Sequence, residues 1–498
     1  MALLRTIYGT CLRNPRKVLI TDDQTQWTGV KLLGAAFHLA RVIRQNTPRG
    51  RVGLMLPTSG AFPAALLGAW QAGKTPVPLN YLLSKDEIRH VVADADLDLV
   101  LTAGKLIDHV GVDYLPESVR TVRLDELAFT GVPPVRWPAR PKDKDLGALL
   151  YTSGTSGLPK GVMLSHGNLA ANARQCIAHA NLTKCTGFLG VLPQFHSFGL
   201  TVLTMIPLVM GAHVTYTARF VPRVIMKLID KHKPQIFVGV PSMYQALLNL
   251  KQAQPGDWDS VKMPISGGEP LPAKIRERFH ERFGKDIYEG YGLTETSPVT
   301  HWATPDGQKP GSVGPAVPDV RVLLMDDHDQ PIRIGPDGAE GEVYLAGPNV
   351  MQGYLNLPDL TAEVIADRVD PADGATVRAF RTGDIGRVDP DGYLSITGRK
   401  KEMLIVSGEN VFPREIENVL DQHPGVGASA VIGMPDESRG EVVLAYVEPA
   451  EGAAPDPADL RTFCRDRLPP FKVPREVRII DTLPRSPTGK VLRRQLSA

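Results

Sequence analysis

The stretch at residues 151–161, YTSGTSGLPKG, joins four serine and threonine hydroxyls, three glycines and one lysine within eleven residues. Glycines let backbone N–H groups converge on one point, hydroxyls add small donors, and Lys160 adds a mobile positive charge. This combination predicts a phosphate-binding loop. It is not a Walker A loop, because Lys160 precedes a glycine and the apolar residues 162–164 predict a strand. A flexible serine–glycine surface loop is the alternative interpretation.

Four further polar stretches carry glycine next to acidic or basic side chains. Taken alone, each has a plain interpretation: Thr294-Glu295 as a solvated turn, Asp384 as a turn residue bonded to its own backbone, and Lys490 as a surface charge. His196 would ordinarily be a histidine of the protein core whose ring nitrogens are hydrogen-bonded. The stretches are ISGGEPL at 265, YEGYGLTET at 288, RTGD at 381 and PRSPTGK at 484.

The elements that must position these residues alternate between strand-like and helix-like patterns in the first part of the chain. Such alternation predicts an α/β architecture with a largely parallel sheet. A second run of this kind follows the first motif, residues 311–397 show the short alternating runs of a β-rich region, and residues 103–145 predict a connector. The first alternating runs are 52–56, 61–72, 76–79, 84–95 and 97–101, and those of the second are 223–231, 235–240 and 241–250.

The length and composition limit the number of domains and the kinds of partner that the protein can have. With 498 residues, 43% hydrophobic and 22% charged, the chain is too long for one ordinary domain. A net charge of +2 without a basic block predicts neither nucleic acid nor an anionic membrane as partner.

Residues 185–218 contain no charged side chain, but proline, glycine and histidine interrupt them. They predict a buried segment, since a spanning helix needs roughly 20 apolar residues. Four scattered cysteines favour a reducing cytoplasm.

Five motifs, in order along nearly the whole chain, resemble those of the superfamily of adenylate-forming enzymes. That superfamily contains acyl-CoA synthetases, peptide-synthetase adenylation domains and beetle luciferase, and the chain looks most like a fatty-acyl-CoA ligase. The resemblance implies a large N-terminal domain, residues 1–398, of α/β sheet subdomains plus a β-rich subdomain, and a small mobile α+β C-terminal domain, residues 399–498. The motifs are YTSGTSGLPKG at 151, YGLTET at 291, RTGD at 381, GRKKEMLIVSGENVFPREIE at 398 and PRSPTGK at 484.

The resemblance also implies a reaction. A carboxylic acid and ATP, with Mg²⁺, give an acyl adenylate and pyrophosphate, and the thiol of coenzyme A then displaces AMP. Lys490 would offset the repulsion between the carboxylate and the α-phosphate, and Lys401 would be the hinge about which the C-terminal domain turns between the two steps. Coenzyme A is the expected acceptor because no carrier domain follows in the sequence. A separate acyl carrier protein stays an alternative, and a homodimer stays open.

The resemblance assigns the remaining site residues by motif. Thr294 would bond the α-phosphate, Glu295 would hold Mg²⁺, and His196 would face the acid. Ser407 and Gly408 would contact coenzyme A, although some relatives carry a lysine where Ser407 stands. The nucleotide-binding residues would be Thr152, Ser153, Gly154, Thr155, Ser156, Gly157, Lys160, Gly267, Gly268, Glu269, Tyr291, Gly292, Asp384 and Arg399. The acyl pocket would be lined by Ser197, Phe198, Val240, Ser242, Met243, Ser297 and Val299.

The acyl-pocket residues are largely apolar and uncharged. No aspartate stands ready for an amino group, which argues against an amino acid substrate. The sequence therefore predicts a cytoplasmic, ATP-dependent ligase that joins a medium- or long-chain fatty acid to coenzyme A. Alternatives are an aryl-acid–CoA ligase, an acyl-carrier-protein ligase and a luciferase-like oxidative enzyme. A non-catalytic adenylate-binding protein is a further alternative, which would be expected to show damage at Lys490, Glu295 or Asp384.

Overall fold

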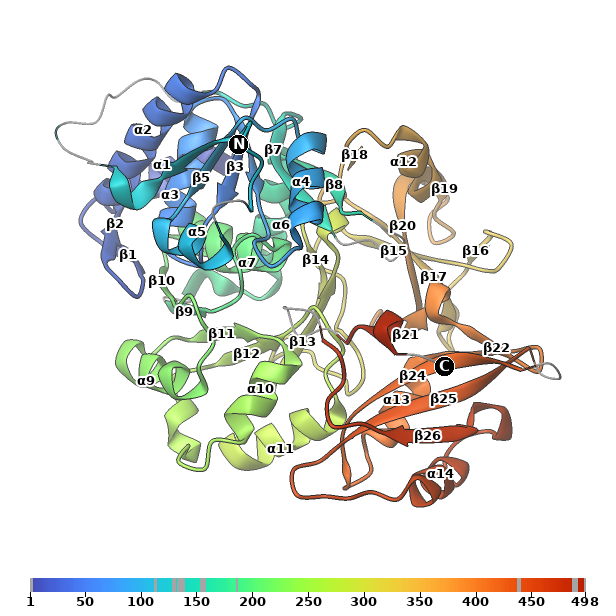
Figure 1. Cartoon of the computed structure of the whole chain (residues 1–498). Coiled ribbons are helices and arrows are strands. Elements are labelled where there is room, and N and C mark those ends of the chain that lie inside the picture. Colours follow the sequence, from blue (N-terminus) through green and yellow to red (C-terminus); the bar gives the residue numbers. More distant parts are fainter. Residues whose placement is uncertain are drawn as a thin grey trace.

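The structure is a computed structural model that describes residues 3–111, 114–127, 131, 139–152, 158–184, 187–436, 440–485 and 491–496. Figure 1 shows two α/β regions on one side, a β-rich region beside them and a C-terminal α+β region below it. This confirms the predicted mixed α/β fold, with a large sheet-containing part and a smaller C-terminal part. No helix among these residues is long and apolar enough to cross a membrane.

The first α/β region is a parallel sheet in the order β4-β3-β5-β6, next to an antiparallel sheet in the order β18-β8-β7. Two of its helices begin with a capping box, formed by Ser84 with Glu87 in α4 and by Ser165 with Asn168 in α6. Its strands are β3 (Arg51–Met55), β4 (Thr75–Pro78), β5 (Leu99–Thr102), β6 (Arg120–Arg123), β7 (Leu146–Thr152), β8 (Lys160–Ser165) and β18 (Gly353–Tyr354), and its helices are α2 (Gly29–Asn46), α3 (Ala61–Gln71), α4 (Lys85–Asp94), α5 (Gly104–Val110) and α6 (His166–His179).

Two elements of this region lie where the sequence predicted a connector. Helix α5 has only seven residues, and β6 is the edge strand of its sheet with a half-exposed RTVR sequence. A short helix and a half-exposed edge strand need no long apolar run, so periodicity does not reveal them. The strand predicted after Lys160 is confirmed as β8.

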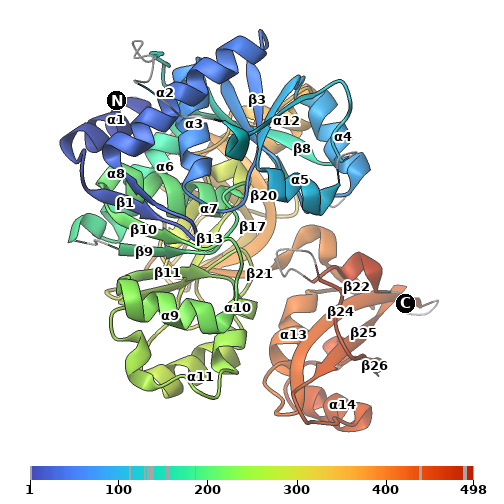
Figure 2. The ribbon, with the colours of Figure 1, turned by 60° about the vertical axis from the view of Figure 1, so that its left-hand side comes forward.

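The second α/β region is the largest sheet, with strand order β14-β13-β12-β11-β9-β10-β1-β2. All its pairings are parallel except the two outermost, β13 with β14 and β1 with β2. The strands are β1 (Val18–Thr21), β2 (Gln26–Thr28), β9 (Gly187–Gly190), β10 (His213–Tyr216), β11 (Ile236–Gly239), β12 (Met263–Ser266), β13 (Tyr288–Gly292) and β14 (Val299–Trp302). On the face seen in Figure 2 lie α9 (Pro222–His232), α10 (Pro241–Leu248) and α11 (Ala273–Phe283).

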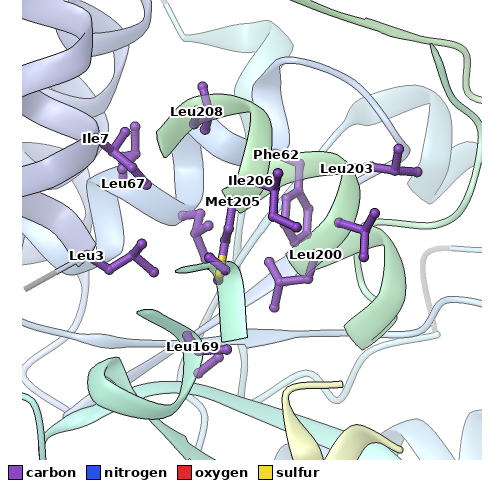
Figure 3. Packing of buried hydrophobic residues seen from close by; sticks show 14 of the residues in the cluster. Leu3, Ile7, Phe62, Leu67, Leu169, Leu200, Leu203, Met205, Ile206 and Leu208 are labelled. Atoms are coloured by element: carbon purple, nitrogen blue, oxygen red, sulfur yellow. The ribbon is translucent and has the colours of Figure 1, made fainter. Parts of the chain in front are cut away.

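The middle of the uncharged segment predicted to be buried is a helical run through the core, and strands β9 and β10 lie before and after it. It comprises α7 (Ser197–Leu200), a π-helical turn (Thr201–Met205) and α8 (Ile206–Met210). Figure 3 shows its side chains packed with those of α1 (Leu3–Arg13), α3 and α6. Burying apolar side chains yields about 25 cal/mol for each Å² removed from water. The segment therefore belongs to the protein core, as the interrupting prolines and glycines predicted.

The β-rich region and the C-terminal region follow. The first is an antiparallel sheet in the order β16-β15-β17-β20-β19, with β21 paired to β20. The second has the order β23-β22-β25-β24, with β26 on β25 and its own core. The elements are β15 (Arg321–Met325), β16 (Pro331–Ile332), β17 (Ala339–Ala346), α12 (Pro358–Val364), β19 (Ile365–Val369), β20 (Thr376–Val388), β21 (Leu394–Arg399), β22 (Leu404–Val406), β23 (Glu409–Val411), α13 (Pro413–Leu420), β24 (Val426–Asp436), β25 (Gly440–Pro449), α14 (Pro457–Arg465) and β26 (Glu476–Ile479).

The C-terminal region touches the second α/β region through a lysine. Lys274 on α11 donates from Nζ to the backbone carbonyl of Val426 at 3.0 Å and of His423 at 3.5 Å. The Lys274 ammonium also lies near the Asp421 carboxylate at the end of α13. Asp421 in turn accepts a 2.7 Å bond from the Ser429 hydroxyl.

The Asp421 carboxyl makes stability depend on pH. Burial raises its pKa from 3.8 to about 7, so the folded state holds this proton more tightly than the unfolded chain. The stabilisation that comes from the protonated Asp421 carboxyl is therefore complete below about pH 4 and is lost as the pH rises through about 7. We expect Asp421→Asn, which still accepts from Ser429, to be less sensitive to pH than the wild type across this window.

Chemical unfolding midpoints at about pH 5 and about pH 8 measure this effect. The matched control is Asp466→Asn, which changes an exposed carboxylate in the same region. If the midpoints of the wild type and Asp421→Asn fall equally between the two pH values, the Asp421 assignment is wrong.

Candidate functional site

A cavity of about 490 Å³ opens where the second α/β region, the β-rich region and the start of the C-terminal region meet. Its polar wall contains Thr152, Lys160, Thr294, Glu295, Glu342, Tyr354, Arg381, Thr382, Arg399, Lys400 and Lys401. Its glycine wall contains Gly267, Gly268, Gly290 and Gly292. The six residues called here the apolar end are Phe198, Val202, Ile265, Pro298, Val299 and Trp302.

The polar wall begins with the two residues that flank the predicted phosphate loop. Thr152 ends β7 and Lys160 begins β8, and the two pair directly across the antiparallel ladder. Residues 153–157, which include the predicted Ser153, Gly154, Thr155, Ser156 and Gly157, lie outside the described residues. The Lys160 ammonium lies 5.8 Å from the ring centre of Tyr354. The ends of the loop thus bring one positive charge to the cavity.

Glu295 faces this charge from a 3-10 turn, Thr294–Thr296. Its Oε1 accepts a 2.8 Å bond from the Tyr354 hydroxyl, and burial raises the pKa of its carboxyl. Among the described residues, no group of three or more His, Cys, Asp or Glu could hold a metal ion. A single carboxylate nevertheless suits Mg²⁺, which keeps waters and takes substrate phosphates as its other ligands.

A buried carboxylate joins three strands behind the glycine wall. Asp384 on β20 accepts a 2.6 Å hydrogen bond from the Tyr291 hydroxyl on β13. Its other carboxylate oxygen lies 2.8 Å from Arg399 Nε on β21. Its side chain is 2% exposed. The Asp384 charge raises the pKa of Arg399. Each carboxylate oxygen can accept more than one bond, so a ligand hydroxyl could add to those already made.

A second carboxylate, that of Glu342 on β17, binds two basic side chains close to the start of the C-terminal region. It accepts hydrogen bonds from Arg381 at 2.6 and 2.9 Å and from Lys400 at 2.9 Å. Its side chain is only 3% exposed. Burial acts to raise the pKa of the Glu342 carboxyl, but the hydrogen bonds from Arg381 and Lys400 outweigh burial and hold that pKa below its usual value. Lys401, the predicted hinge, follows directly and also lines the cavity.

The glycine wall leaves a flat space over β12 and β13. A Cβ at Gly292 would collide with the Pro298 carbonyl oxygen, and one at Gly267 would meet the Phe198 ring at 3.1 Å. Gly268 has a φ of +83°, which favours glycine. The bare backbone beside the Tyr291 ring is therefore a surface on which a flat ring system could lie.

His196 stands between the polar wall and the apolar end. Its Nδ1 accepts from the Phe198 N–H at 3.3 Å, which puts the ring proton of the neutral form on Nε2. The surrounding protein lowers the pKa of the imidazole, although the ring itself is exposed to the cavity. Beside it, the Ser197 and Thr294 hydroxyls lie 3.2 Å apart. These groups place hydrogen-bond donors where the two ends of the cavity join.

Several predicted site residues lie away from the cavity wall. Ser297 is fully buried and its hydroxyl donates to the Asn349 carbonyl, so it holds the backbone in place. Ser407 and Gly408 form an exposed turn between β22 and β23, both with positive φ. Lys490 lies outside the described residues. Also absent from the described wall are Val240, Ser242 and Met243, which lie at the start of α10, Glu269, and Asp384, which bonds the wall residues Tyr291 and Arg399.

Three residues of the site carry no motif that the sequence could show. Glu342, Tyr354 and Trp302 are single residues brought in by strand pairing or by a turn from elsewhere in the chain. Tyr354 lies 59 residues from Glu295, and Glu342 lies 39 residues from Arg381. Only the approach of these strands reveals their roles in the wall.

The AMP-binding enzyme family matches residues 9–355, and the AMP-binding enzyme C-terminal domain matches residues 415–490. A long-chain-fatty-acid–CoA ligase of Bacillus subtilis is 32% identical over 97% of this chain and 92% of its own. A feruloyl-CoA synthase of Amycolatopsis is 33% identical over 96% of this chain and 95% of its own. ATP-bound MatB from Rhodopseudomonas palustris superposes with a TM-score of 0.88 at 30% identity, covering 99% of this chain and 98% of that one.

The Glu342 contacts yield a stability prediction. Glu342→Gln leaves Arg381 and Lys400 side by side without their shared negative charge. Breaking a fully buried pair costs about 3–5 kcal/mol, but both cations are partly solvated, so we expect about 2 kcal/mol. Chemical unfolding measures the loss. Glu340→Gln, on the same strand and exposed, is the control, and equal losses in the two variants would contradict the assignment.

Proposed function

Because this chain belongs to the AMP-binding enzyme family, we propose that it is an acid–thiol ligase: it activates a carboxylic acid with ATP and transfers the acyl group to coenzyme A. One observation carries the proposal. A single cavity joins a cationic and carboxylate-bearing wall, suited to MgATP, to an apolar end suited to the acid, with Thr294 and His196 at the junction.

ATP would lie along the polar and glycine walls. Lys160 and the loop ending at Thr152 would meet the β and γ phosphates, and the adenine would lie on Gly267 and Gly268 beside Tyr291. Asp384 would accept from the ribose hydroxyls while Tyr291 and Arg399 hold it in place. Mg²⁺ bound by Glu295 would neutralise phosphate charge.

Two displacements complete the reaction. A carboxylate oxygen of the acid forms a bond to the α-phosphorus, and the bond from that phosphorus to the bridging oxygen breaks to release pyrophosphate. The sulfur of the thiol then forms a bond to the acyl carbon, and AMP leaves with the bonding pair as the thiol proton is lost to water. The Thr294 hydroxyl and the His196 Nε2–H would donate to the oxygens on which negative charge develops.

The acceptor and the acid complete the proposal. We propose coenzyme A, contacted by the turn at Ser407 and Gly408, with a carrier protein as the alternative. The six side chains of the apolar end bear no charge, which favours an apolar acid because an unpaired buried charge is costly. A medium- or long-chain fatty acid is our first choice and an aryl acid the second. The cytoplasm is the proposed compartment.

Pyrophosphate release with MgATP across a panel of acids tests the proposal. The panel runs from acetate through octanoate to palmitate and includes benzoate and cinnamate, each with and without coenzyme A. We expect release with the longer aliphatic acids and a coenzyme A thioester as product. Pyrophosphate release with aryl acids alone would change the proposed substrate to an aryl acid and leave the proposed mechanism unchanged. The absence of release with every acid would overturn the ligase proposal.

The role proposed for Lys490 has its own test. We expect Lys490→Ala to slow pyrophosphate release roughly a hundredfold to a thousandfold, by analogy with the loss of one preorganised donor. ATP affinity, measured by calorimetry, should change much less, because the lysine is proposed to act as charge develops. Lys251→Ala, which removes an exposed lysine, is the control. Loss of ATP affinity as large as the loss of rate would make Lys490 a binding residue.

A further inference from the structure

Tyr354 contacts two charged residues of the polar wall. Its hydroxyl donates a 2.8 Å hydrogen bond to Oε1 of Glu295, and the Lys160 ammonium lies 5.8 Å from the centre of its ring. Tyr354 is 9% exposed and lines the cavity. A buried tyrosine hydroxyl usually finds a hydrogen-bond partner, and here that partner is the carboxylate proposed to hold Mg²⁺.

The backbone on both sides of Tyr354 fixes where its side chain begins. Tyr354 pairs with Val162 between β18 and β8, and its N–H donates to the Thr361 hydroxyl on α12 at 2.9 Å. Gly353, which precedes it, has a φ of +151°, and a Cβ there would lie 2.6 Å from Thr361 Cγ2. A strand and a helix therefore hold this segment closely, so the tyrosine ring has a defined place in the wall.

The turn that carries Glu295 is bonded to the same segment. The Met351 N–H donates to the Glu295 carbonyl oxygen at 2.8 Å. The Asn349 side chain donates to the Thr296 carbonyl oxygen at 2.9 Å. With the bond from Tyr354, three hydrogen bonds join the two segments, and the third is the one that reaches the carboxylate. The relative positions of the tyrosine and the carboxylate are thus set by backbone contacts as well as by their own bond.

The bond from Tyr354 uses one oxygen of the Glu295 carboxylate. Glu295 is half-buried and lines the cavity, and no described side chain hydrogen-bonds its second oxygen, Oε2. Because Oε1 is held, the carboxylate group cannot rotate freely, so Oε2 keeps one direction. Mg²⁺ demands near-ideal octahedral geometry and usually binds through one or two carboxylates, so a fixed carboxylate suits it.

We propose that Tyr354 is a positioning residue for the metal: its hydroxyl holds the Glu295 carboxylate in the orientation in which Oε2 can bind Mg²⁺. This inference rests on the proposed ligase function, in which Mg²⁺ accompanies ATP. Side chains that hold a metal ligand in place fix its orientation, and their loss typically lowers metal affinity about 10- to 100-fold. Tyr354 acts through Glu295 and not on the reacting atoms.

Direct measurement of metal binding tests this role. Mn²⁺ is the probe in place of Mg²⁺, and its affinity for the protein saturated with a non-hydrolysable ATP analogue is read from the EPR signal of the free ion. Tyr354→Phe removes the hydroxyl but keeps the ring beside Lys160. We expect this variant to bind Mn²⁺ about tenfold more weakly. Its affinity for the analogue without metal should stay near that of the wild type, which also shows that the site is folded.

The Mg²⁺ dependence of pyrophosphate release gives a second readout. In Tyr354→Phe the half-saturating Mg²⁺ concentration should rise by a factor similar to the loss of Mn²⁺ affinity. Saturating Mg²⁺ should then restore most of kcat, because the hydroxyl is proposed to act on metal binding and not on the chemical step.

Tyr344 provides a matched control. Its hydroxyl donates to Asp329 at 2.7 Å, and the Arg368 guanidinium lies 5.7 Å from its ring centre, so it makes the same two kinds of contact. Neither Tyr344 nor Asp329 belongs to the described cavity wall. Tyr344→Phe should therefore leave Mn²⁺ affinity unchanged.

A double variant separates positioning from general damage to the site. Glu295→Gln should itself weaken Mn²⁺ binding. Adding Tyr354→Phe to Glu295→Gln should cause no further loss, because the route through the carboxylate is already removed.

The outcomes distinguish this inference from the function on which it rests. Equal Mn²⁺ affinities in the wild type and Tyr354→Phe would overturn the positioning role and leave the ligase function intact. So would an unchanged affinity in Glu295→Gln, or a full further loss in the double variant. If the wild type releases no pyrophosphate with any acid, the ligase proposal fails, and the Mn²⁺ titrations still decide the role of Tyr354.

Discussion

The buried Asp384 carboxylate is the contact on which the arrangement of the site depends. It bonds the Tyr291 hydroxyl on the large sheet and the Arg399 guanidinium at the end of the β-rich sheet, and it is almost inaccessible to water. A buried charge is tolerated only with such partners, so the three strands are held in one register. Because Arg399 immediately precedes Lys400 and Lys401, the same carboxylate also fixes where the C-terminal region begins.

The cavity follows from this junction. The antiparallel pair β13 and β14 closes one edge of a parallel sheet, and its bulge lets both Val299 and Trp302 face the cavity. Glycines keep the adjoining wall flat, while Lys160, Glu295 and Glu342 arrive from three different sheets or turns. Opposite ends of one space thus differ sharply in polarity. That difference is what lets a single site accept a polyphosphate and an apolar acid together.

Motifs that are continuous in sequence were predictable, and contacts between distant strands were not. The helix capped by Ser84 and the strand after Lys160 follow from local periodicity and capping chemistry. Tyr354 and Trp302 enter the site through pairings that no local pattern encodes. Conversely, motif neighbours such as Ser297 turn their side chains into the protein, because the backbone there needs a buried donor. A motif identifies a backbone segment, whereas the direction of each side chain depends on tertiary contacts.

The Lys274 contact with the C-terminal region bears on how that region could be exchanged between relatives. Lys274 donates to the backbone carbonyls of His423 and Val426, and every amino acid sequence carries such carbonyls. The large part of the protein therefore recognises the shape of this turn more than its side chains. Grafting a C-terminal module from a distant homologue would preserve this anchor wherever the loop conformation is kept, so the join is suited to recombination by gene fusion.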